Sequence, residues 1–361
     1  MKLFLILPLL VTVVTAQFGG FGGLGQVGSA INRGVGSLAS RVQSLPVVNN
    51  VANFADFAAQ TGKTYADAAE RTLRENLFTA RKSLVDANNA AFAAGGKSYE
   101  LAVNAFADLT SGEFLSRLTG NKKSAQGESK AKAHRQLAKP KAGPVPDSWD
   151  WREKGGVTPV KFQGECGSCW TFATTGAIEG HIFRKTGKLI SLSEQNLVDC
   201  GKEDFGLVGC DGGFQEYAFE FITSSQKGIA FGDKYPYLDK KDKCSYQNGI
   251  KGAEIKGFAA ITPKDEKTMK EVIATLGPLA CSLNGLESLL LYKKGIYADE
   301  ECNKGEVNHS VLVVGYGSEN GQDYWIVKNS WDKNWGEDGY FRLPRGNNFC
   351  GIAMECSYPV V

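Results

Sequence analysis

One cysteine stands in a sequence context that suits a nucleophile. Residues 163–170 read Gln-Gly-Glu-Cys-Gly-Ser-Cys-Trp, and small residues follow Cys169 at helical spacing as far as about Lys185. This pattern predicts a closely packed helix that begins at Cys169. A helix N-terminus lowers the pKa of a thiol, because the helix dipole favours an anion there. We therefore expect Cys169 to react as a thiolate.

Two residues far downstream supply groups that such a thiolate needs. His309 leads into one apolar strand, and Asn329 closes another strand further along the chain. A thiolate that attacks a carbonyl needs an imidazole to hold its charge and to protonate the leaving amine. Asn329 would orient that imidazole, while the Gln163 side chain and the backbone N–H of Cys169 would stabilise the oxyanion. These four residues predict acyl transfer from a peptide.

Three other interpretations explain less of this pattern. Cys166 and Cys169 alone would form a redox Cys-x-x-C motif, but His309 and Asn329 would then have no role. A zinc site needs further ligands at short spacing, and the sequence offers none, so we expect no metal and no cofactor. An inactive, binding-only protein is disfavoured because every group that catalysis requires is present.

The chain changes character near residue 145. Residues 50–92 are rich in Ala, Leu, Glu and Arg and predict helix. Residues 121–144 are polar and basic, which predicts an exposed linker that a protease cuts. Residues 1–143 hold 17 Lys and Arg against 9 Asp and Glu, or +8, whereas residues 144–361 hold 24 against 30, or −6. The net charge of +2 gives no global field that would favour nucleic acid.

The N-terminal residues predict entry into the secretory pathway. Residues 1–16 combine a charged start, an apolar run and a small-residue cleavage site, as a signal peptide does. Residues 17–49 are glycine-rich, and we expect a flexible segment there rather than a dinucleotide motif, because no strand precedes the glycines. No other apolar run is long enough to span a membrane. The only glycosylation sequon, residues 308–310, adjoins His309 and is interpreted as unused, so we expect the extracellular space or a digestive lumen, with the lysosome as the alternative.

Together these motifs resemble the papain family of cysteine proteases, and most closely the cathepsin L group. The resemblance implies an α+β, papain-like fold with one helical lobe and one β-barrel lobe, preceded by a helical propeptide. It also implies that Cys169 and His309 face each other across a cleft. The motifs that carry it, in the order of the family, are residues 151–155, residues 163–170, residues 209–213, His309 and residues 329–331.

The N-terminal half resembles the inhibitory propeptide of that family. The resemblance implies a propeptide domain over residues 50–120 and a mature peptidase over residues 145–361. Arg81 stands where the propeptide pattern has Asn, and Ala102 stands where a second propeptide motif begins with Gly. The remaining pattern positions are Glu70, Arg74, Phe78, Val85 and Asn89.

The resemblance also implies a substrate site whose S2 pocket selects the residue two before the cut. Glu355 departs from the small neutral residue that is common at this position in cathepsin L-like enzymes. A carboxylate there would accept Arg through a charge-assisted contact, in addition to the Phe or Leu that apolar walls accept. The residues implied to bind substrate are Gly212, Gly213, Phe214, Gln215, Ser282, Val307, Ser310, Trp331 and Glu355.

The nine cysteines all lie after residue 165, and their odd number leaves at least one thiol unpaired. By resemblance, the bridges are Cys166–Cys210, Cys200–Cys244 and Cys302–Cys350. With Cys169 as nucleophile, Cys281 and Cys356 remain, either as two buried thiols or as a fourth bridge.

The resulting hypothesis is a monomeric cysteine endopeptidase made as a zymogen. It would act on proteins and peptides through an acyl-enzyme, with its own propeptide as inhibitor and without nucleic acid or membrane partners. Cutting near residues 140–146 would release the mature enzyme. Acid protonates carboxylates and weakens the attraction between a basic propeptide and an acidic enzyme, so activation should accelerate below about pH 5.

Overall fold

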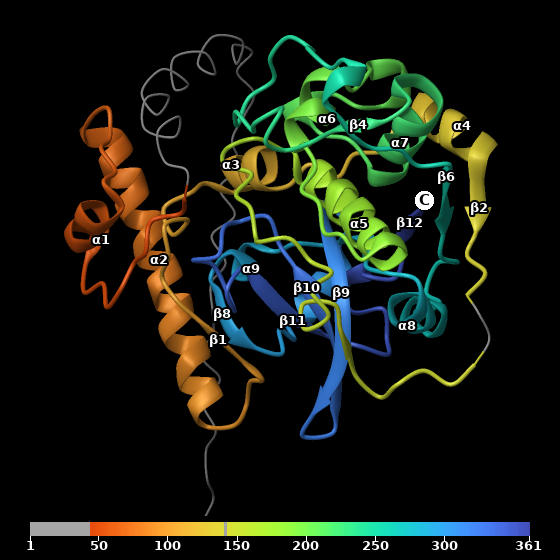
Figure 1. Ribbon diagram of the computed structural model, residues 1–361. Helices are drawn as coiled ribbons and strands as arrows, with labels where there is room; N and C mark the ends of the chain where they lie inside the picture. The colour runs from red at the N-terminus through yellow and green to blue at the C-terminus, as the bar shows by residue number, and fades with distance from the viewer. Residues whose placement is uncertain (1–43, 141–142) are drawn as a thin grey trace, which may run out of the picture.

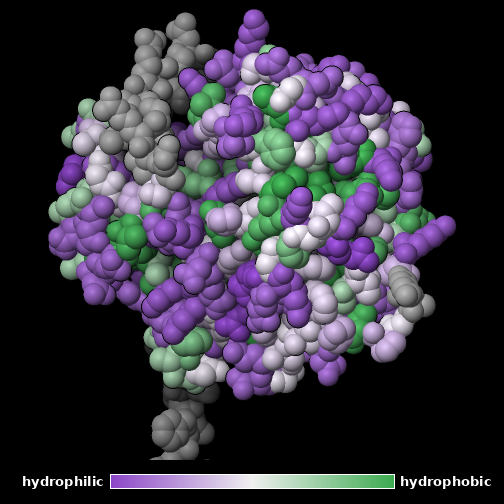
Figure 2. Space-filling model, viewed as in Figure 1, coloured by the Kyte–Doolittle hydropathy of each residue, from purple (hydrophilic) through white to green (hydrophobic). Residues whose placement is uncertain are grey.

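The computed structural model describes residues 44–140 and 143–361 (Figure 1). The predicted signal peptide and most of the predicted glycine-rich segment lie outside these residues. An N-terminal helical unit lies on one side of a β-rich lobe, and a mainly helical lobe lies above that lobe in the view. Figure 2 shows hydrophilic residues over much of the outer surface of the helical unit. No helix within the described ranges combines the length and apolar character that a bilayer crossing requires.

The N-terminal unit contains two helices where the composition predicts one stretch. α1 (Phe54–Thr61) ends at Gly62, whose φ of 67° is in the left-handed region that favours glycine. α2 (Ala68–Ala93) follows after a short turn. The two helices pack through aromatic rings, since the centroids of Phe57 and Phe78 lie 5.0 Å apart. Shorter elements complete the unit: β1 (Tyr99–Leu101), α3 (Ser111–Glu113) and the π-helix η3 (Phe114–Leu118).

Residues 121–144 correct the prediction of an exposed linker. Their described part forms α4 (Ala125–His134) and then β2 (Arg135–Leu137). β2 adds in parallel to the strand β6 (Gly257–Ala260) of the C-terminal part. Many of these residues are exposed as predicted, but a polar, basic composition did not reveal the helix, the strand and their distant partners. Lys130 and Arg135 pair with carboxylates of the C-terminal part.

The helical lobe is organised around α5 (Cys169–Thr186), which begins where the sequence predicts. A Cβ on Gly176 would lie 2.8 Å from the Leu312 side chain, and one on Gly180 would lie 2.6 Å from Pro278. These glycines therefore let α5 pack closely against the β-rich lobe. The other elements are α6 (Glu194–Cys200), η4 (Glu203–Phe205), η5 (Gly209–Asp211), α7 (Gln215–Glu220), η6 (Phe221–Gln226), β4 (Ile229–Ala230), η7 (Asn248–Ile250) and β5 (Lys251–Ala253).

The β-rich lobe contains a sheet in the order β11-β10-β9-β7-β12-β6-β2, with β3 beside β9. β9 and β10 form a hairpin, and β7 flanks β9 with Leu283 opposite His309 and Ser282 opposite Ser310. The remaining bounds are β3 (Trp149–Asp150), α8 (Glu266–Thr275), β7 (Leu279–Leu283), α9 (Glu287–Leu290), β8 (Tyr292–Gly295), η8 (Glu300–Lys304), β9 (His309–Glu319), β10 (Gln322–Lys328), β11 (Tyr340–Pro344), η9 (Phe349–Gly351) and β12 (Ser357–Val360).

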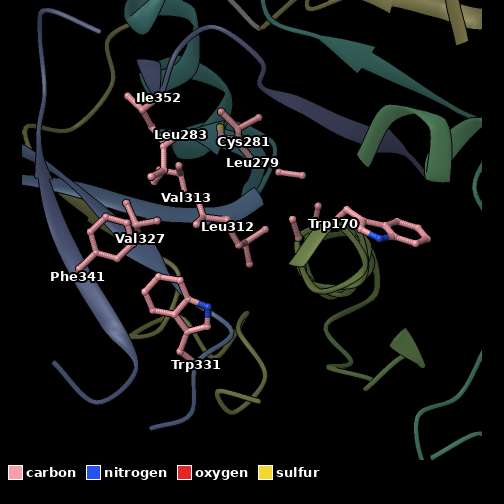
Figure 3. Close-up of a cluster of buried hydrophobic side chains, with 14 of the residues drawn as sticks. Trp170, Leu279, Cys281, Leu283, Leu312, Val313, Val327, Trp331, Phe341 and Ile352 are labelled. Atoms are coloured by element: carbon pink, nitrogen blue, oxygen red, sulfur yellow. The ribbon is translucent and has the colours of Figure 1, made fainter. Parts of the chain in front are cut away.

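Buried apolar side chains hold the lobes in place (Figure 3). Leu283, Val313, Val327 and Phe341 are fully buried between the strands of the β-rich lobe. Leu312 extends from β9 towards α5 and joins this core to the helical lobe. The packing fixes the beginning of β9 against the beginning of α5, which is where the predicted chemistry lies.

Candidate active site

Cys169 is the first residue of α5 and is completely buried. Its Sγ accepts a hydrogen bond from the backbone N–H of Ser310, at 3.3 Å. Since Ser310 directly follows His309 in β9, this contact places the cysteine beside the histidine where the two lobes meet. This geometry agrees with the expectation that Cys169 and His309 face each other.

The hairpin of β9 and β10 brings His309 and Asn329 together. His309 Nε2 lies 2.8 Å from Asn329 Oδ1, which also accepts a hydrogen bond from the backbone N–H of Ser330. The second bond fixes the amide with its oxygen towards the imidazole. The indole of Trp331 stacks on the imidazole, with ring centroids 4.8 Å apart. His309 Nδ1 is buried without a hydrogen-bond partner in the described part of the chain, so it is the ring atom available to a thiol.

Gln163 is oriented as a hydrogen-bond donor. Its Oε1 accepts from the Ser330 hydroxyl at 2.5 Å, which turns Nε2 away from that side. Nε2 donates to the carbonyl oxygens of Cys166, at 2.9 Å, and of Arg117, at 3.2 Å. An oxyanion donor must point at a carbonyl oxygen in this way. Here a carbonyl of the N-terminal unit takes that place.

Burial favours the neutral forms of Cys169 and His309 in this covered state, whereas the expectation of a thiolate concerns an open site. Burial raises the pKa of the Cys169 thiol to about 11, despite the opposing hydrogen bond from Ser310. Burial also lowers the pKa of the His309 imidazole to about 4, although its bond to Asn329 acts in the other direction. Loss of water around both groups therefore favours their neutral forms.

The N-terminal unit covers the pair with an extended stretch of chain, residues 119–123. The backbone N–H of Lys122 donates to the Gly213 carbonyl at 2.8 Å, and the N–H of Gly213 donates to the Gly120 carbonyl at 2.9 Å. A Cβ on Gly120 would lie 2.0 Å from the carbonyl oxygen of Gly167, so only glycine fits there. Gly212 flanks the same stretch, since a Cβ on it would lie 2.9 Å from the Gly120 oxygen. The backbone expected to bind substrate is thus occupied by the chain itself.

Gln215 joins the walls of the predicted S2 pocket. Its Nε2 donates to the Ser282 hydroxyl at 3.0 Å and to the Glu355 carbonyl at 3.1 Å, and its Oε1 accepts from the Ser310 hydroxyl at 3.1 Å. These bonds use both amide protons, so the fully buried Gln215 supports the pocket and has none left for a ligand. Val307 is partly buried against Gly351.

Two residues that the sequence analysis assigned to the linker occupy this pocket. Lys123 forms an ion pair with the Glu355 carboxylate, and its ammonium lies 5.3 Å from the centre of the Phe214 ring. The Asn121 amide donates to the Ser282 hydroxyl and, at 3.4 Å, to Glu355 Oε2. The signal that could have found them was the contrast between a basic linker and an acidic C-terminal part.

Comparison with known proteins assigns both parts of the chain. Residues 145–360 match the papain family cysteine protease model, and residues 54–114 match the cathepsin propeptide inhibitor domain. The chain belongs to the papain family of cysteine proteases. The N-terminal unit is its propeptide, and the C-terminal part is its peptidase domain, called the mature domain below.

Individual relatives narrow the group. The chain is 42% identical to a cathepsin L-like peptidase of Aedes aegypti, over 84% of this chain and 91% of the relative. It is 42% identical to cathepsin L of Sarcophaga peregrina, with the same coverage of each. The structure of digestive procathepsin L 3 from the Tenebrio molitor larval midgut superimposes with a TM-score of 0.77 at 38% identity, covering 85% of this chain and 97% of that one. The protein is therefore a cathepsin L-like cysteine protease with a papain-like fold.

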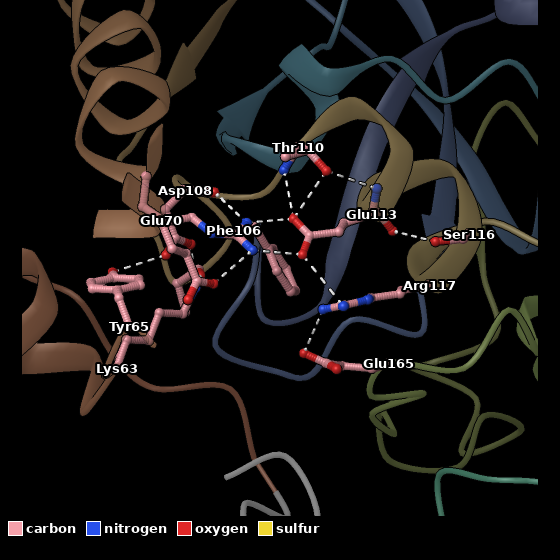
Figure 4. A network of polar contacts seen from close by, with 12 residues as sticks. Lys63, Tyr65, Glu70, Phe106, Asp108, Thr110, Glu113, Ser116, Arg117 and Glu165 are labelled. Carbon is pink, nitrogen blue, oxygen red and sulfur yellow. Dashed lines mark hydrogen bonds and ion pairs between the residues drawn. The ribbon is translucent and has the colours of Figure 1, made fainter. Parts of the chain in front are cut away.

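A buried ion-pair network fastens the propeptide of this protease (Figure 4). Arg74 of α2 contacts both carboxylate oxygens of Glu113, one of them at 2.8 Å, and donates to the Asp108 carbonyl at 3.0 Å. Arg117 extends the network into the mature domain through Glu165, at 3.1 Å. The charged positions of the propeptide pattern thus hold α2 against the turn that leads into the cleft.

The two departures from the propeptide pattern have structural counterparts. The buried guanidinium of Arg81 donates to the Phe106 carbonyl at 3.0 Å and pairs with Glu287 of the mature domain at 2.8 Å. Ala102 contributes its backbone N–H to the Leu291 carbonyl, at 2.7 Å, a contact that requires no particular side chain. Arg81 therefore adds a direct bond between propeptide and protease.

The protease contains four disulfides, one more than the resemblance implies. Cys281 of β7 is bridged to Cys356, directly before β12, which resolves the alternative that the sequence left open. Cys169 is the single free cysteine, since all nine lie in the described residues. The other bridges are Cys166–Cys210, Cys200–Cys244 and Cys302–Cys350.

The disulfides and the cathepsin L relatives indicate a protein of the secretory pathway or the lysosome. The side chain of the sequon residue Asn308 is engaged on both of its polar atoms. Its Nδ2 donates to the Gly285 carbonyl at 3.1 Å, and its Oδ1 accepts from the Gly285 N–H at 2.9 Å. A glycan on Nδ2 would disturb this pairing next to His309.

Proposed function

We propose that the protein is a cysteine endopeptidase zymogen whose mature form cuts peptide bonds through Cys169 and His309. The observation that carries this proposal is the position of Cys169 Sγ on the Ser310 N–H, beside an imidazole whose other nitrogen is held by Asn329. The thiolate attacks the scissile carbonyl, and the imidazolium protonates the leaving amine. Gln163 Nε2 and the Cys169 N–H stabilise the oxyanion, and water assisted by His309 then hydrolyses the acyl-enzyme.

The propeptide keeps this machinery silent in two ways. Residues 119–123 occupy the cleft, and their cover leaves the thiol and the imidazole neutral. We propose that cutting near residues 140–146 yields a mature enzyme of about 217 residues, from 145 to 361. Departure of the chain from the cleft readmits water, which favours the charged pair.

We further propose that the S2 pocket accepts Arg as well as Phe or Leu. Lys123 supports this, because the propeptide places a cation on Glu355 and over the ring of Phe214. The guanidinium of a substrate Arg would meet the same carboxylate. A hydrogen bond to a charged group contributes about 1.5–3 kcal/mol, or about one to two decades in relative kcat/KM.

Two peptide substrates that differ only by Phe or Arg at this position test the proposal. Glu355→Gln should lower kcat/KM for the Arg substrate by about 10- to 100-fold and leave the Phe substrate within about two-fold. Glu306→Gln, at an exposed position without a side-chain partner in the described residues, is the control. Equal losses on both substrates would remove Glu355 from the specificity pocket. Cys169→Ala should abolish hydrolysis, and normal turnover by that variant would refute the nucleophile assignment.

Both polar atoms of the Asn308 side chain are hydrogen-bonded, so the sequon offers no favourable site for a glycan that would direct the enzyme to lysosomes. This favours action in the extracellular space or a digestive lumen. We propose this location and a monomeric mature form. Mature enzyme confined to lysosomes, or a dimer in sedimentation experiments, would contradict the respective proposal.

A further inference from the structure

A second propeptide segment contacts the mature domain away from the inhibitor domain. Residues 124–138, called the clasp here, comprise the capping residue Ser124, α4, β2 and Ala138. They lie outside both matched regions, which cover residues 54–114 and 145–360. In Figure 1 the clasp lies on the opposite side of the molecule from α1 and α2. It is therefore a separate structural element of this chain.

Small residues let α4 lie directly on α7 of the mature domain. A Cβ on Gly127 would lie 2.5 Å from the ring of Tyr217, and Ala131 is completely buried. The hydroxyl of Tyr217 donates to the Ser124 carbonyl at 3.2 Å. Gly127 and Ala131 are four residues apart and so lie on the same face of α4, and their small size allows this face to pack closely on α7.

Three side chains of the clasp, those of Lys130, His134 and Arg135, each meet a different carboxylate of the mature domain. Glu216 and Glu220 are only 4% and 2% exposed, and Glu220 Oε2 has no hydrogen-bond partner in the described residues. Without the clasp these two carboxylates would lose the basic side chains that now face them. The pairs are Lys130–Asp204 at 2.6 Å, His134–Glu220 at 2.9 Å and Arg135–Glu216 at 2.6 Å.

Backbone hydrogen bonds complete the contact. β2 lies parallel to β6, with Arg135 opposite Phe258 and Leu137 opposite Ala260, and the Ala138 N–H donates to the Ala260 carbonyl at 2.9 Å. Removal of the clasp would leave β6 as a free edge, which is a template for an added strand. A cavity of about 590 Å³ under the clasp is lined by both Glu216 and Glu355, so this face adjoins the S2 pocket.

We propose that this face is a peptide-binding site of the mature protease outside the catalytic cleft. Its ligand is the clasp itself, a basic segment that binds as a short helix followed by an edge strand. The proposal rests on the proposed activation, because a cut near residues 140–146 breaks the covalent link between the clasp and the mature domain. Every contact described above involves residues before the cut, so the cut removes none of them. The cleaved propeptide then binds the mature domain through the clasp, beside the S2 pocket, without a covalent link.

The test measures binding without turnover. Mature protease is alkylated at Cys169 with iodoacetamide and titrated with a fluorescein-labelled peptide of residues 124–138, followed by fluorescence anisotropy. Saturable binding is expected, and it should weaken as salt rises from about 0.1 to about 1 M, because the Debye length falls from about 10 to about 3 Å. No saturation below about 1 mM peptide would overturn the proposal.

Matched variants identify the contacts. An Arg135→Gln peptide should bind about 10- to 100-fold more weakly, the loss expected for a charge-assisted bond. A Lys132→Gln peptide, changed at an exposed position without an ion pair in the described chain, should stay within about two-fold of the original. On Glu216→Gln protease, Arg135→Gln should cost little further affinity. Equal losses from the two peptide changes would show non-specific charge attraction and refute the site.

The location of binding is tested separately. Protease whose cleft carries a covalent peptidyl inhibitor on Cys169 should still bind the clasp peptide, whereas displacement by the inhibitor would place the peptide in the cleft and refute the proposal. Circular dichroism checks the fold of Glu216→Gln, and Asp204→Asn provides a second variant at an exposed position that should also weaken binding. A failure of the proposed catalytic roles would appear in the turnover of unalkylated enzyme and would leave these binding results unchanged.

Discussion

Replacing Glu113 with Gln should loosen the propeptide at neutral pH and have little effect in strong acid. The Glu113 carboxylate has a side chain only 15% exposed and receives both terminal nitrogens of Arg74 as well as the Thr110 N–H. Burial alone would raise its pKa, but these hydrogen bonds lower the pKa from 4.5 to about 2. The ionised form is therefore the one that the folded propeptide prefers.

The size and direction of the effect follow from that pKa. At about 1.36 kcal/mol per pH unit, the difference corresponds to roughly 3 kcal/mol of stability at pH 7. Because the folded pKa is depressed, this stability is present above about pH 4.5 and is lost as the pH falls towards about 2. About half of it remains near pH 3.3. This ion pair therefore begins to weaken at a lower pH than the value of about 5 at which ordinary carboxyl pKa values predict faster activation.

Hydrogen exchange of α2 in the full-length Cys169→Ala zymogen measures this effect without self-processing. At pH 7, Glu113→Gln should lower the opening free energy of α2 by roughly 2–3 kcal/mol, whereas near pH 3 the variant and its parent should differ by only roughly 1 kcal/mol. Glu75→Gln, on an exposed position of the same helix, is the control. A deficit that stays constant or grows as the pH falls would refute the assignment of the stability to the ionised pair.

Three further variants test other parts of the molecule. Gln163→Ala should lower the kcat of the mature enzyme by about 10²- to 10³-fold, as measured on one peptide substrate, because an oxyanion donor is lost. Joint replacement of Cys281 and Cys356 by Ala should lower thermal stability, with a loss of about 2–4 kcal/mol in denaturant unfolding; non-reducing mass analysis of alkylated parent protein should show one labelled cysteine. Arg81→Ala should speed propeptide removal by added active protease, because the bond to Glu287 is lost; an unchanged rate would show that this bond does not hold the propeptide.

Local sequence signals predicted where the helix that carries Cys169 begins. The start of α5 followed from the small residues after Cys169, whereas the pairing of His309 with Asn329 was expected from the chemistry that a thiolate requires. The helix signal rests on periodicity, which a single sequence displays directly. The hairpin of β9 and β10 that brings His309 and Asn329 together was not predicted. The residues of the S2 pocket came from the family resemblance, because they lie on β7, β9 and the C-terminal segment, and long-range strand pairing has no local signature.

The clasp could not be predicted for a related reason. Its residues are polar and basic, and composition alone does not distinguish a solvated linker from a segment whose cations have distant partners. The carboxylates that pair with Lys130, His134 and Arg135 lie 74 to 86 positions away in the sequence. The same limit applies to Cys281 and Cys356, which are separated by 75 positions and brought together only by the order of strands in the sheet.

The protonation state of Cys169 illustrates how tertiary burial overrides a local rule. A helix N-terminus stabilises a charge by about 0.3–1 kcal/mol at exposed sites and up to about 2 kcal/mol in partly buried ones. Burial of Cys169 in the zymogen instead raises the thiol pKa from 9.0 to about 11, equivalent to roughly 3 kcal/mol in the opposite direction. The local rule concerns the open cleft, where water also solvates the anion, whereas the zymogen removes that water. Residues 119–123 therefore block the site proposed for substrate and help to keep water from the Cys169 thiol.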